Sequence, residues 1–493
     1  MNSPVINKLL PYIKLQRNDS TPLYLQIAQG IVKAIQVKIV LRGEKLPGTR
    51  LLSERLYIHR QTVVAAYDEL AAQGWIEILP QRGAYVTQQK IKAPHPPIIT
   101  KEEKEKQLPY QLYSNPVLDL SSNVLHSSLF LTDGTPDYRT TDLKLLNTFL
   151  SAASQSKWLL NQLNKNIHSE NENLKNQLIN LLLIQKGIAV NAEKILVTGN
   201  HKISTLCILR TLIKPNDIVV VTQPGHYFIN MMLKDCGAKL YTVSLNEKGL
   251  DIEELKSILA KENIRAFYIH TNTLYPTART LSEEQKKELI ALAKTYGFAI
   301  IEDDSGTDFI FDRQSPTSLI HHDDQHTVVY LNSLEGLLPP PYDMGYIVAP
   351  SSVIRELQKV KNTLQSTSSP LIEHALSEYV KEGYFLRQAQ RLTKLYLRRR
   401  NQFSVLLDSY FDRIIDFNPP HMGLAFWVEF KQKVPLLTIC RNCERKGLTI
   451  PQHILYQDKY ITAMRIGYGH LNEQEAEKAI KIWSEGFYEV LYQ

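Results

Sequence analysis

Residues 43–86 constrain the fold of this chain more than any other segment. They contain two short amphipathic stretches, an apolar β-prone run, a basic turn at Gln81-Arg82-Gly83 and a second β-prone run. In the first stretch, Leu52 and Leu56 stand at the spacing of a helix face that packs on a small core. Pro47 closes the loop before it. Two helices followed by a β-hairpin make a winged helix-turn-helix, which the segment therefore predicts.

The second helix is expected to begin near His59, with polar residues in its first turn. Arg60, Gln61 and Thr62 stand there, and apolar residues recur at helical spacing after them. The first turn of a recognition helix meets base edges, while its free N–H groups and its dipole attract phosphate. We therefore predict a DNA-binding domain over residues 12–88.

The hairpin turn and the local charge support the same prediction. Gly83 permits a tight turn, and Arg82 at the tip can reach a phosphate or the minor groove. From Lys14 to Val86 there are ten Lys or Arg residues against six Asp or Glu, an excess of four positive charges. Two arginines on a helix pair also suit a solvated surface, but the order of elements favours double-stranded DNA. The candidate DNA-binding residues are Arg50, Ser53, Arg60, Gln61, Thr62, Arg82 and Gly83.

The same segment resembles the GntR family of bacterial regulators. The matching residues are Leu46, Pro47, Arg50, Leu52, Ser53, Arg60, Thr62, Val63, Ala66, Tyr67, Leu70, Gly74, Arg82, Gly83 and Val86. The resemblance implies a DNA-binding transcriptional regulator.

The length and composition leave room for a second, larger domain. The chain has 493 residues, of which 43% are hydrophobic and 22% charged, as in ordinary globular proteins. No apolar stretch reaches the roughly 18 residues that span a bilayer, and the N-terminal residues lack the apolar core of a signal peptide. We therefore expect a cytoplasmic protein with no membrane partner.

The four cysteines predict neither a disulfide framework nor a metal site. Cys440 and Cys443 form one C-x-x-C pair, with no second pair and no histidines at ligand spacing. Two free thiols on a helix are the expected arrangement.

Residues 89–117 are rich in proline and charge and predict a linker between the domains. Beyond it, over residues 118–493, helical patterns alternate with short β-branched runs. Continuous apolar strands between helices imply a mainly parallel sheet with helices on both faces, an α/β fold. The runs are 194–198, 217–222, 266–270, 298–302 and 327–331.

The second domain resembles the fold-type I aminotransferases, which use pyridoxal phosphate. The segments that carry the resemblance are Gly134-Thr-Pro-Asp137, Gln185-Lys-Gly-Ile188, Leu196-Val-Thr-Gly199, Gln223-Pro-Gly225, His270-Thr-Asn-Thr-Leu-Tyr-Pro276, Ile301-Glu-Asp-Asp304 and Ala463-Met-Arg-Ile-Gly-Tyr468. A GntR-type winged helix joined to such a domain is the arrangement of the MocR/GabR subfamily, which the chain resembles over nearly its whole length.

The chain departs from that family at the cofactor anchors. In the family, the Schiff-base lysine lies in a Ser-x-Ser-Lys stretch, and an arginine that holds the phosphate follows it. Here Glu335 or Gly336 stands at the lysine, and Tyr342 or Asp343 at the arginine. Only a primary amine forms the imine, so neither residue can replace the lysine. A carboxylate beside the phosphate would repel it by about 1 kcal/mol or more at close range.

Two further positions differ in the same way. Ser305 replaces a tyrosine that serves the phenolic oxygen of the cofactor, and His226 stands where an aromatic ring stacks. The resemblance leaves a degenerate set of cofactor positions: Gly199, Asn200, His226, Asn272, Asp303 and Ser333. Of these, Asp303 is able to pair with a pyridinium nitrogen. We therefore expect no cofactor; pyridoxal phosphate could bind only non-covalently or through a lysine from elsewhere, such as Lys359 or Lys361.

Arg465 matches the arginine that binds the substrate carboxylate in the family, where its planar fork allows bidentate recognition. A structural ion pair is the other interpretation of this residue. We therefore predict a transcriptional regulator, acting as a homodimer, whose aminotransferase-like domain senses a small carboxylate-bearing effector. The alternatives are a pyridoxal-phosphate-dependent aminotransferase with a DNA-binding extension, and a constitutive DNA-binding dimer without a ligand.

Overall fold

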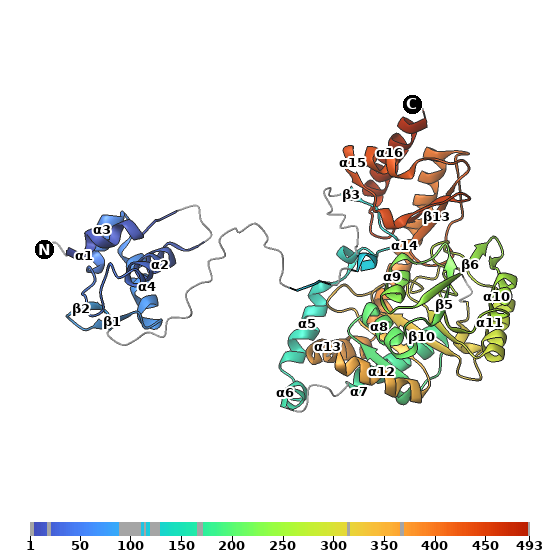
Figure 1. Cartoon of the computed structure of the whole chain (residues 1–493), viewed down its shortest axis with the longest axis horizontal. Coiled ribbons are helices and arrows are strands. Elements are labelled where there is room, and N and C mark those ends of the chain that lie inside the picture. Colours follow the sequence, from blue (N-terminus) through green and yellow to red (C-terminus); the bar gives the residue numbers. More distant parts are fainter. Residues whose placement is uncertain are drawn as a thin grey trace. The chain divides into compact units, whose positions relative to one another are not determined.

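The computed structural model describes residues 4–16, 21–87, 110–112, 115–118, 129–164, 171–312, 316–364 and 369–491. The chain divides into two compact units, Met1–Leu112 and Tyr113–Gln493 (Figure 1). The predicted linker, residues 89–117, lies largely outside the described residues. In the described ranges, no helix is long and apolar enough to cross a membrane.

The first unit is a helical domain with a β-hairpin. Its elements are α1 (Pro4–Leu9), α2 (Leu23–Gln36), α3 (Thr49–Leu56), α4 (Arg60–Ala72), β1 (Ile76–Leu79) and β2 (Gly83–Val86). The two strands are antiparallel, with Leu79 opposite Gly83. The hairpin turn uses left-handed backbone at Gln81 (φ 62°) and Gly83 (φ 104°). The order of elements confirms the predicted winged helix-turn-helix.

Local residues fix the two helices of the motif. The backbone of Tyr57 turns left-handed and ends α3, and His59 caps α4 by accepting the N–H of Gln61 on its ring at 3.3 Å. The buried Tyr67 hydroxyl donates to the carbonyl of Pro47 at 2.7 Å, which ties the loop before α3 to α4. The positions of Arg60 and its neighbours therefore rest on a small, fully packed core.

The second unit is built on an eight-stranded sheet. In spatial order its strands are β4 (Ile195–Thr198), β11 (Gly345–Val348), β10 (Val328–Ser333), β9 (Ala299–Asp303), β8 (Ile264–Ile269), β5 (Ile218–Gln223), β6 (Lys239–Asn246) and β7 (Gly249–Leu250). Strands β10, β9, β8, β5 and β6 pair in parallel, whereas β11 is antiparallel to both of its neighbours. The prediction of a mainly parallel sheet is confirmed; the sequence analysis did not single out β6 or β11.

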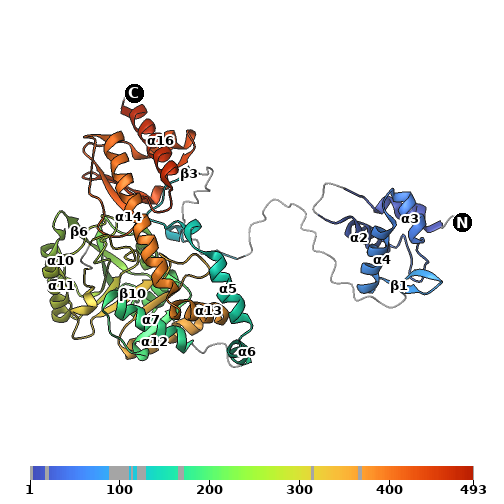
Figure 2. The same ribbon diagram turned by 180° about the vertical axis from the view of Figure 1, so that it is seen from behind.

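Helices cover both faces of this sheet (Figures 1 and 2). On β5, Val219 and Val221 belong to one buried cluster and Val220 to the other, because successive side chains point to opposite faces. The helices of the sheet region are α5 (Leu143–Ser154), α6 (Lys157–Asn164), α7 (Glu172–Leu181), α8 (His201–Leu212), α9 (Tyr227–Asp235), α10 (Ile252–Leu259), α11 (Glu283–Tyr296), α12 (Ser351–Thr363) and α13 (Pro370–Lys381). Helices α8 and α12 contribute to the cluster of Val219, and α10 and α11 to that of Val220.

A smaller antiparallel sheet completes the unit. Its order is β12 (Ile415–Phe417), β13 (Ala425–Phe430), β16 (Thr462–Gly467) and β15 (Leu455–Gln457), with helices α14 (Tyr384–Phe411), α15 (Leu436–Arg445) and α16 (Glu473–Leu491). A short parallel pair, β3 (Leu129–Phe130) and β14 (Leu448–Thr449), joins the start of the unit to this layer. Cys440 and Cys443 lie on α15 as free thiols. The described residues contain no group of three or more His, Cys, Asp or Glu arranged to hold a metal ion.

The Tyr67–Pro47 hydrogen bond should contribute measurably to the stability of the winged helix. We expect Tyr67→Phe to lower the free energy of unfolding of this domain by about 1 kcal/mol, because a buried carbonyl loses its partner. Tyr85→Phe is the matched control, since its hydroxyl makes only a long contact of 3.4 Å at an exposed site. Hydrogen exchange of the α4 amides in the full chain measures both. Equal protection in the two variants would contradict the assignment.

Candidate functional site

Two sites follow from the sequence, and the first is the face formed by α3, α4 and the wing. Arg60 is the first residue of α4, and its Nε donates to the Thr49 hydroxyl, at the start of α3, over 3.4 Å. Arg50 and Gln61 are exposed beside them, and Thr62 is half-buried. The structure thus brings the N-terminal residues of both helices together. Among the predicted DNA-binding residues, Ser53 differs: it is buried and its hydroxyl donates to the carbonyl of Arg50 at 2.8 Å.

The wing adds a cation that the sequence analysis did not identify. Arg82 and Gly83 are exposed at the tip of the hairpin. Lys45 forms a bridge with Tyr85 on β2, and its ammonium lies 5.7 Å from the centre of that ring. A Cβ on Gly83 would come within 3.2 Å of the Lys45 side chain, so the glycine leaves room for it. Lys45 is distant from the wing in sequence, and only the backbone bridge places it there.

The second site is a cleft of about 520 Å³ in the second unit. Five of its lining residues follow the carboxyl ends of β4, β5, β8, β9 and β10, in that order: His201, His226, His270, Ser305 and Glu335. In open α/β sheets, ligands bind in the crevice at this edge. Further lining comes from the loop at Asp133–Tyr138 and from Arg465 on β16.

Asp303, at the end of β9, is 1% exposed and fully partnered. His201 donates its Nε2–H to Oδ2 of Asp303 over 2.8 Å, and the Tyr268 hydroxyl donates to the same oxygen. His270 lies 3.4 Å from it, and the Ser305 N–H donates to Oδ1 at 3.0 Å. Asp303 is therefore already paired with a cation of the chain itself, although the resemblance pairs it with the pyridinium of a cofactor.

The protonation of this cluster follows from its burial and charge. Burial alone would lower the pKa of His201, but the charge and hydrogen bond of Asp303 raise it from 6.5 to about 9. Burial would raise the pKa of Asp303, yet His201 and His270 hold it well below its usual value. Burial lowers the pKa of His226 well below 6.5. At neutral pH the cleft thus contains a His201–Asp303 ion pair beside a neutral His226.

The resemblance places Glu335 or Gly336 at the position of the Schiff-base lysine. A Cβ on Gly336 would meet the side chain of Asp308, which would have to shift to admit it. Burial raises the pKa of Asp308 to about 7 and that of Glu335 above its usual value. Neither Glu335 nor Gly336 supplies an amine, so these two positions do not fit a covalently bound pyridoxal phosphate.

The lysines differ in whether they have an amine near the cleft. Of the lysines that the structure describes, Lys202 lines it, and its ammonium lies 5.0 Å from the ring centre of Phe228. Lys186 lies 3.0 Å from a carboxylate oxygen of Asp304. Lys359 and Lys361 lie on α12 and do not line the cleft.

Most of the other predicted cofactor positions do not line the cleft. Asn200 caps α8 by accepting the N–H of Ile203 at 3.0 Å, beside Gly199. Ser333 is buried at the end of β10, and its hydroxyl has no hydrogen-bond partner among the described residues. The amide of Asn272 is occupied by Asp304 and Lys286. Of the predicted set, His226 lines the cleft directly, and Asp303 contributes through His201.

Arg465 lines the cleft and forms no ion pair with a described residue at salt-bridge distance. Its Nε and Nη1 donate to the carbonyls of Asp133 and Pro276, both at 2.9 Å, and its guanidinium lies 4.5 Å from the ring centre of Tyr275. These contacts fix the fork and leave its second terminal nitrogen for another acceptor. The sequence analysis missed His201, Lys202, His270 and Asp308, because only the fold brings them to Asp303 and Gly336.

Fold and sites together define a helix-turn-helix protein that carries an aminotransferase-like domain. Residues 131–482 match the family Aminotransferase class I and II, and residues 23–86 match Bacterial regulatory proteins, gntR family. The chain belongs to the aminotransferase class I and II family, with a gntR-type winged helix at its N-terminal side.

Relatives share both parts. The transcriptional regulator YjiR of Escherichia coli is 26% identical, covering 95% of this chain and 99% of its own length. MocR of Rhizobium meliloti, a probable rhizopine catabolism regulatory protein, is 20% identical over 88% of this chain and 87% of its own. The solved α-aminoadipate aminotransferase LysN of Thermus thermophilus matches with a TM-score of 0.66 and 18% identity, covering 74% of this chain and 93% of that protein. The predicted MocR-type arrangement is confirmed.

The His201–Asp303 pair predicts how stability depends on pH. Since the pKa of His201 rises from 6.5 to about 9 on folding, the folded chain keeps a proton that the unfolded chain releases between these values. The pair therefore stabilises the fold fully below pH 6.5 and loses its contribution as the pH rises through about 9. Asp303→Asn should cost about 3–5 kcal/mol, because it leaves a buried imidazolium unpaired.

Denaturant unfolding of the second unit in the full chain, below pH 6.5 and above pH 9, measures this dependence. We expect His201→Gln to lose less stability with rising pH than the wild type does. His453→Gln, an exposed histidine of the same cleft, is the control and should follow the wild type. Parallel curves for His201→Gln and the wild type would contradict the ion pair.

Proposed function

We propose that this chain is a sequence-specific DNA-binding transcriptional regulator whose second domain pairs two chains and binds a small effector. Whole-length similarity to helix-turn-helix regulators favours this function over an aminotransferase with a DNA-binding extension. The DNA partner is a double-stranded operator read by Arg60, Gln61 and Thr62 on α4 and by Arg82 on the wing. A homodimer places two such domains on two half-sites. The location is cytoplasmic.

One observation carries the proposal that the second domain works without covalent pyridoxal phosphate. His201 already neutralises Asp303 at 2.8 Å, the carboxylate that a cofactor pyridinium would need. The tight approach of Gly336 to Asp308 and the lack of an amine at Glu335 support the same conclusion. We therefore propose a domain that senses a ligand rather than one that transaminates.

The effector is proposed to be a small carboxylate-bearing molecule at Arg465. A guanidinium held by two carbonyls keeps its position and its charge, which favours recognition of a carboxylate. A cleft of about 520 Å³ is large enough for a small molecule, which favours a ligand-responsive regulator over a constitutive dimer. The effector shifts the dimer between arrangements by its differential affinity for them.

DNA binding by single-residue variants tests the regulator. Arg82→Ala should weaken binding to all sequences and reduce the salt slope by about one unit, because a phosphate contact is lost. Arg60→Ala should cost roughly 1–3 kcal/mol if the side chain reads a base. Lys8→Ala on α1 removes one charge outside the motif and is the matched control. The measurement is a salt titration with operator DNA obtained by footprinting upstream of regulated genes. Wild-type affinity and slope for both arginine variants would overturn the assignment.

A further inference from the structure

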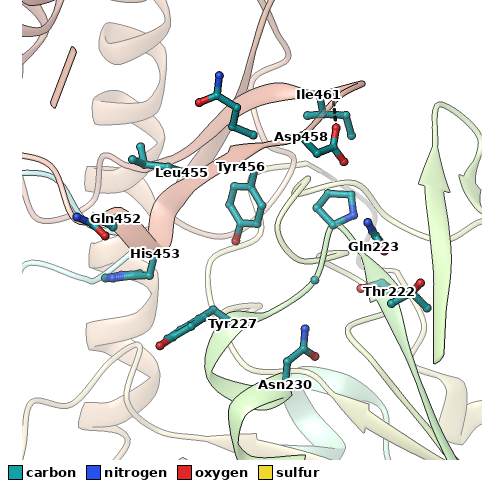
Figure 3. Close-up of a pocket in the computed structure, with 14 residues that line it drawn as sticks. Thr222, Gln223, Tyr227, Asn230, Gln452, His453, Leu455, Tyr456, Asp458 and Ile461 are labelled. Carbon is teal, nitrogen blue, oxygen red and sulfur yellow. Dashed lines mark hydrogen bonds between the residues drawn. The ribbon is translucent and has the colours of Figure 1, made fainter. Parts of the chain in front are cut away.

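A second cavity of about 670 Å³ adjoins the cleft (Figure 3). It lies between the turn from β5 to α9 on one side and the segment from Gln452 to Ile461, which includes β15, on the other. Figure 3 shows Tyr227 and Asn230 below this space and Tyr456 above it. None of the predicted DNA or cofactor residues lines it.

The cleft and this outer cavity share two lining residues, Tyr227 and His453. Figure 3 shows both side chains at the same end of the outer cavity. Tyr227 and His453 therefore stand between the two cavities, and both side chains are exposed. We call the cleft the inner compartment and the second cavity the outer compartment; a ligand that reaches from one to the other passes these two side chains.

The outer compartment offers neutral hydrogen-bonding groups. The side-chain amides of Gln223, Asn230 and Gln452 form no hydrogen bond with any described residue. Each can donate and accept. Two further polar side chains are engaged: the Gln457 amide donates to the carbonyl of Val434 at 2.8 Å, and the Asp458 carboxylate accepts two backbone N–H groups. No lysine or arginine lines this compartment among the described residues. It suits an uncharged polar chain rather than a phosphate.

The inner compartment offers a fixed cation and an unpartnered imidazole nitrogen. Arg465 is held by two carbonyls and by the face of Tyr275. Nδ1 of His226 is buried and has no hydrogen-bond partner among the described residues. His226 lines the inner compartment and lies 4.2 Å from Tyr275, ring centre to ring centre. A carboxylate at Arg465 therefore lies beside a group that still needs a hydrogen bond.

We infer that the two compartments together bind a short peptide with a free carboxyl terminus; this inference rests on the proposed effector function. The terminal carboxylate binds Arg465. The peptide groups, each with one N–H and one C=O, meet the free amides of Gln223, Asn230 and Gln452. The rings of Tyr227 and Tyr456 give apolar faces for the peptide's side chains. A single amino acid would leave the outer amides in water.

Calorimetry on the full chain with three probes tests this: alanine, tri-alanine, and tri-alanine with an amidated carboxyl terminus. We expect tri-alanine to bind at least tenfold more tightly than alanine, and its amide at least tenfold more weakly than tri-alanine. The double variant Gln223→Ala with Asn230→Ala should weaken tri-alanine binding severalfold and leave alanine binding unchanged. Arg465→Gln should abolish the difference in affinity between tri-alanine and its amide. Arg465→Lys keeps a positive charge at this position and controls for loss of folding.

Failure of tri-alanine to bind, or equal affinity for alanine and tri-alanine, would overturn the inference. Wild-type binding of tri-alanine by the double variant would overturn it as well. If alanine binds through Arg465 while tri-alanine gains nothing, the effector function stands and only the peptide inference fails. Wild-type DNA affinity and salt slope in both arginine variants would be a separate failure, of the proposed function.

Discussion

The buried carboxylate at the end of β9 determines the chemistry of the second domain. Asp303 is 1% exposed, and an ionised group at that depth needs a partner of opposite charge and satisfied lone pairs. Each time a cofactor left the site, this buried carboxylate would remain without a partner. His201, on the first turn of α8, supplies an imidazolium from within the chain at neutral pH. The rest of the cleft is then free to recognise another ligand.

The scaffold persists because its requirements differ from those of catalysis. The sheet needs apolar strands with both faces covered, and residues such as Val220 and Phe267 meet that need without any cofactor. The loops after the strands carry the chemistry and tolerate substitution. Glu335, Gly336 and Asp308 lie in such loops, next to the paired strands β10 and β11 or after β9. The same fold can therefore carry a different function, because function depends on the site and not on the fold alone.

The sequence predicted the elements well because each rests on local pattern. Polar residues before an apolar stripe set the start of α4 at Arg60, and β-branched runs set β5 and β9. The loss of the Schiff-base lysine and the change at Ser305 rest on the resemblance and stay predictions. The sequence could not predict His201 against Asp303 or Lys45 against the wing, since each contact joins residues far apart in the chain through the fold. The sequence also could not predict that the free amides of the outer compartment lie together, because the fold brings them there.

Labelling with pyridoxal phosphate shows whether the second domain has an imine-forming lysine. The full chain is incubated with excess pyridoxal phosphate, reduced with borohydride and digested, and the masses of the peptides are measured by mass spectrometry. We expect no stoichiometric label in the second domain, and an identical result for Lys202→Arg, which removes the amine that lines the cleft. Stoichiometric labelling of one lysine in the wild type would contradict this expectation. Loss of the label in Lys202→Arg would assign it to Lys202, and the labelled peptide would show whether it lies at Lys186.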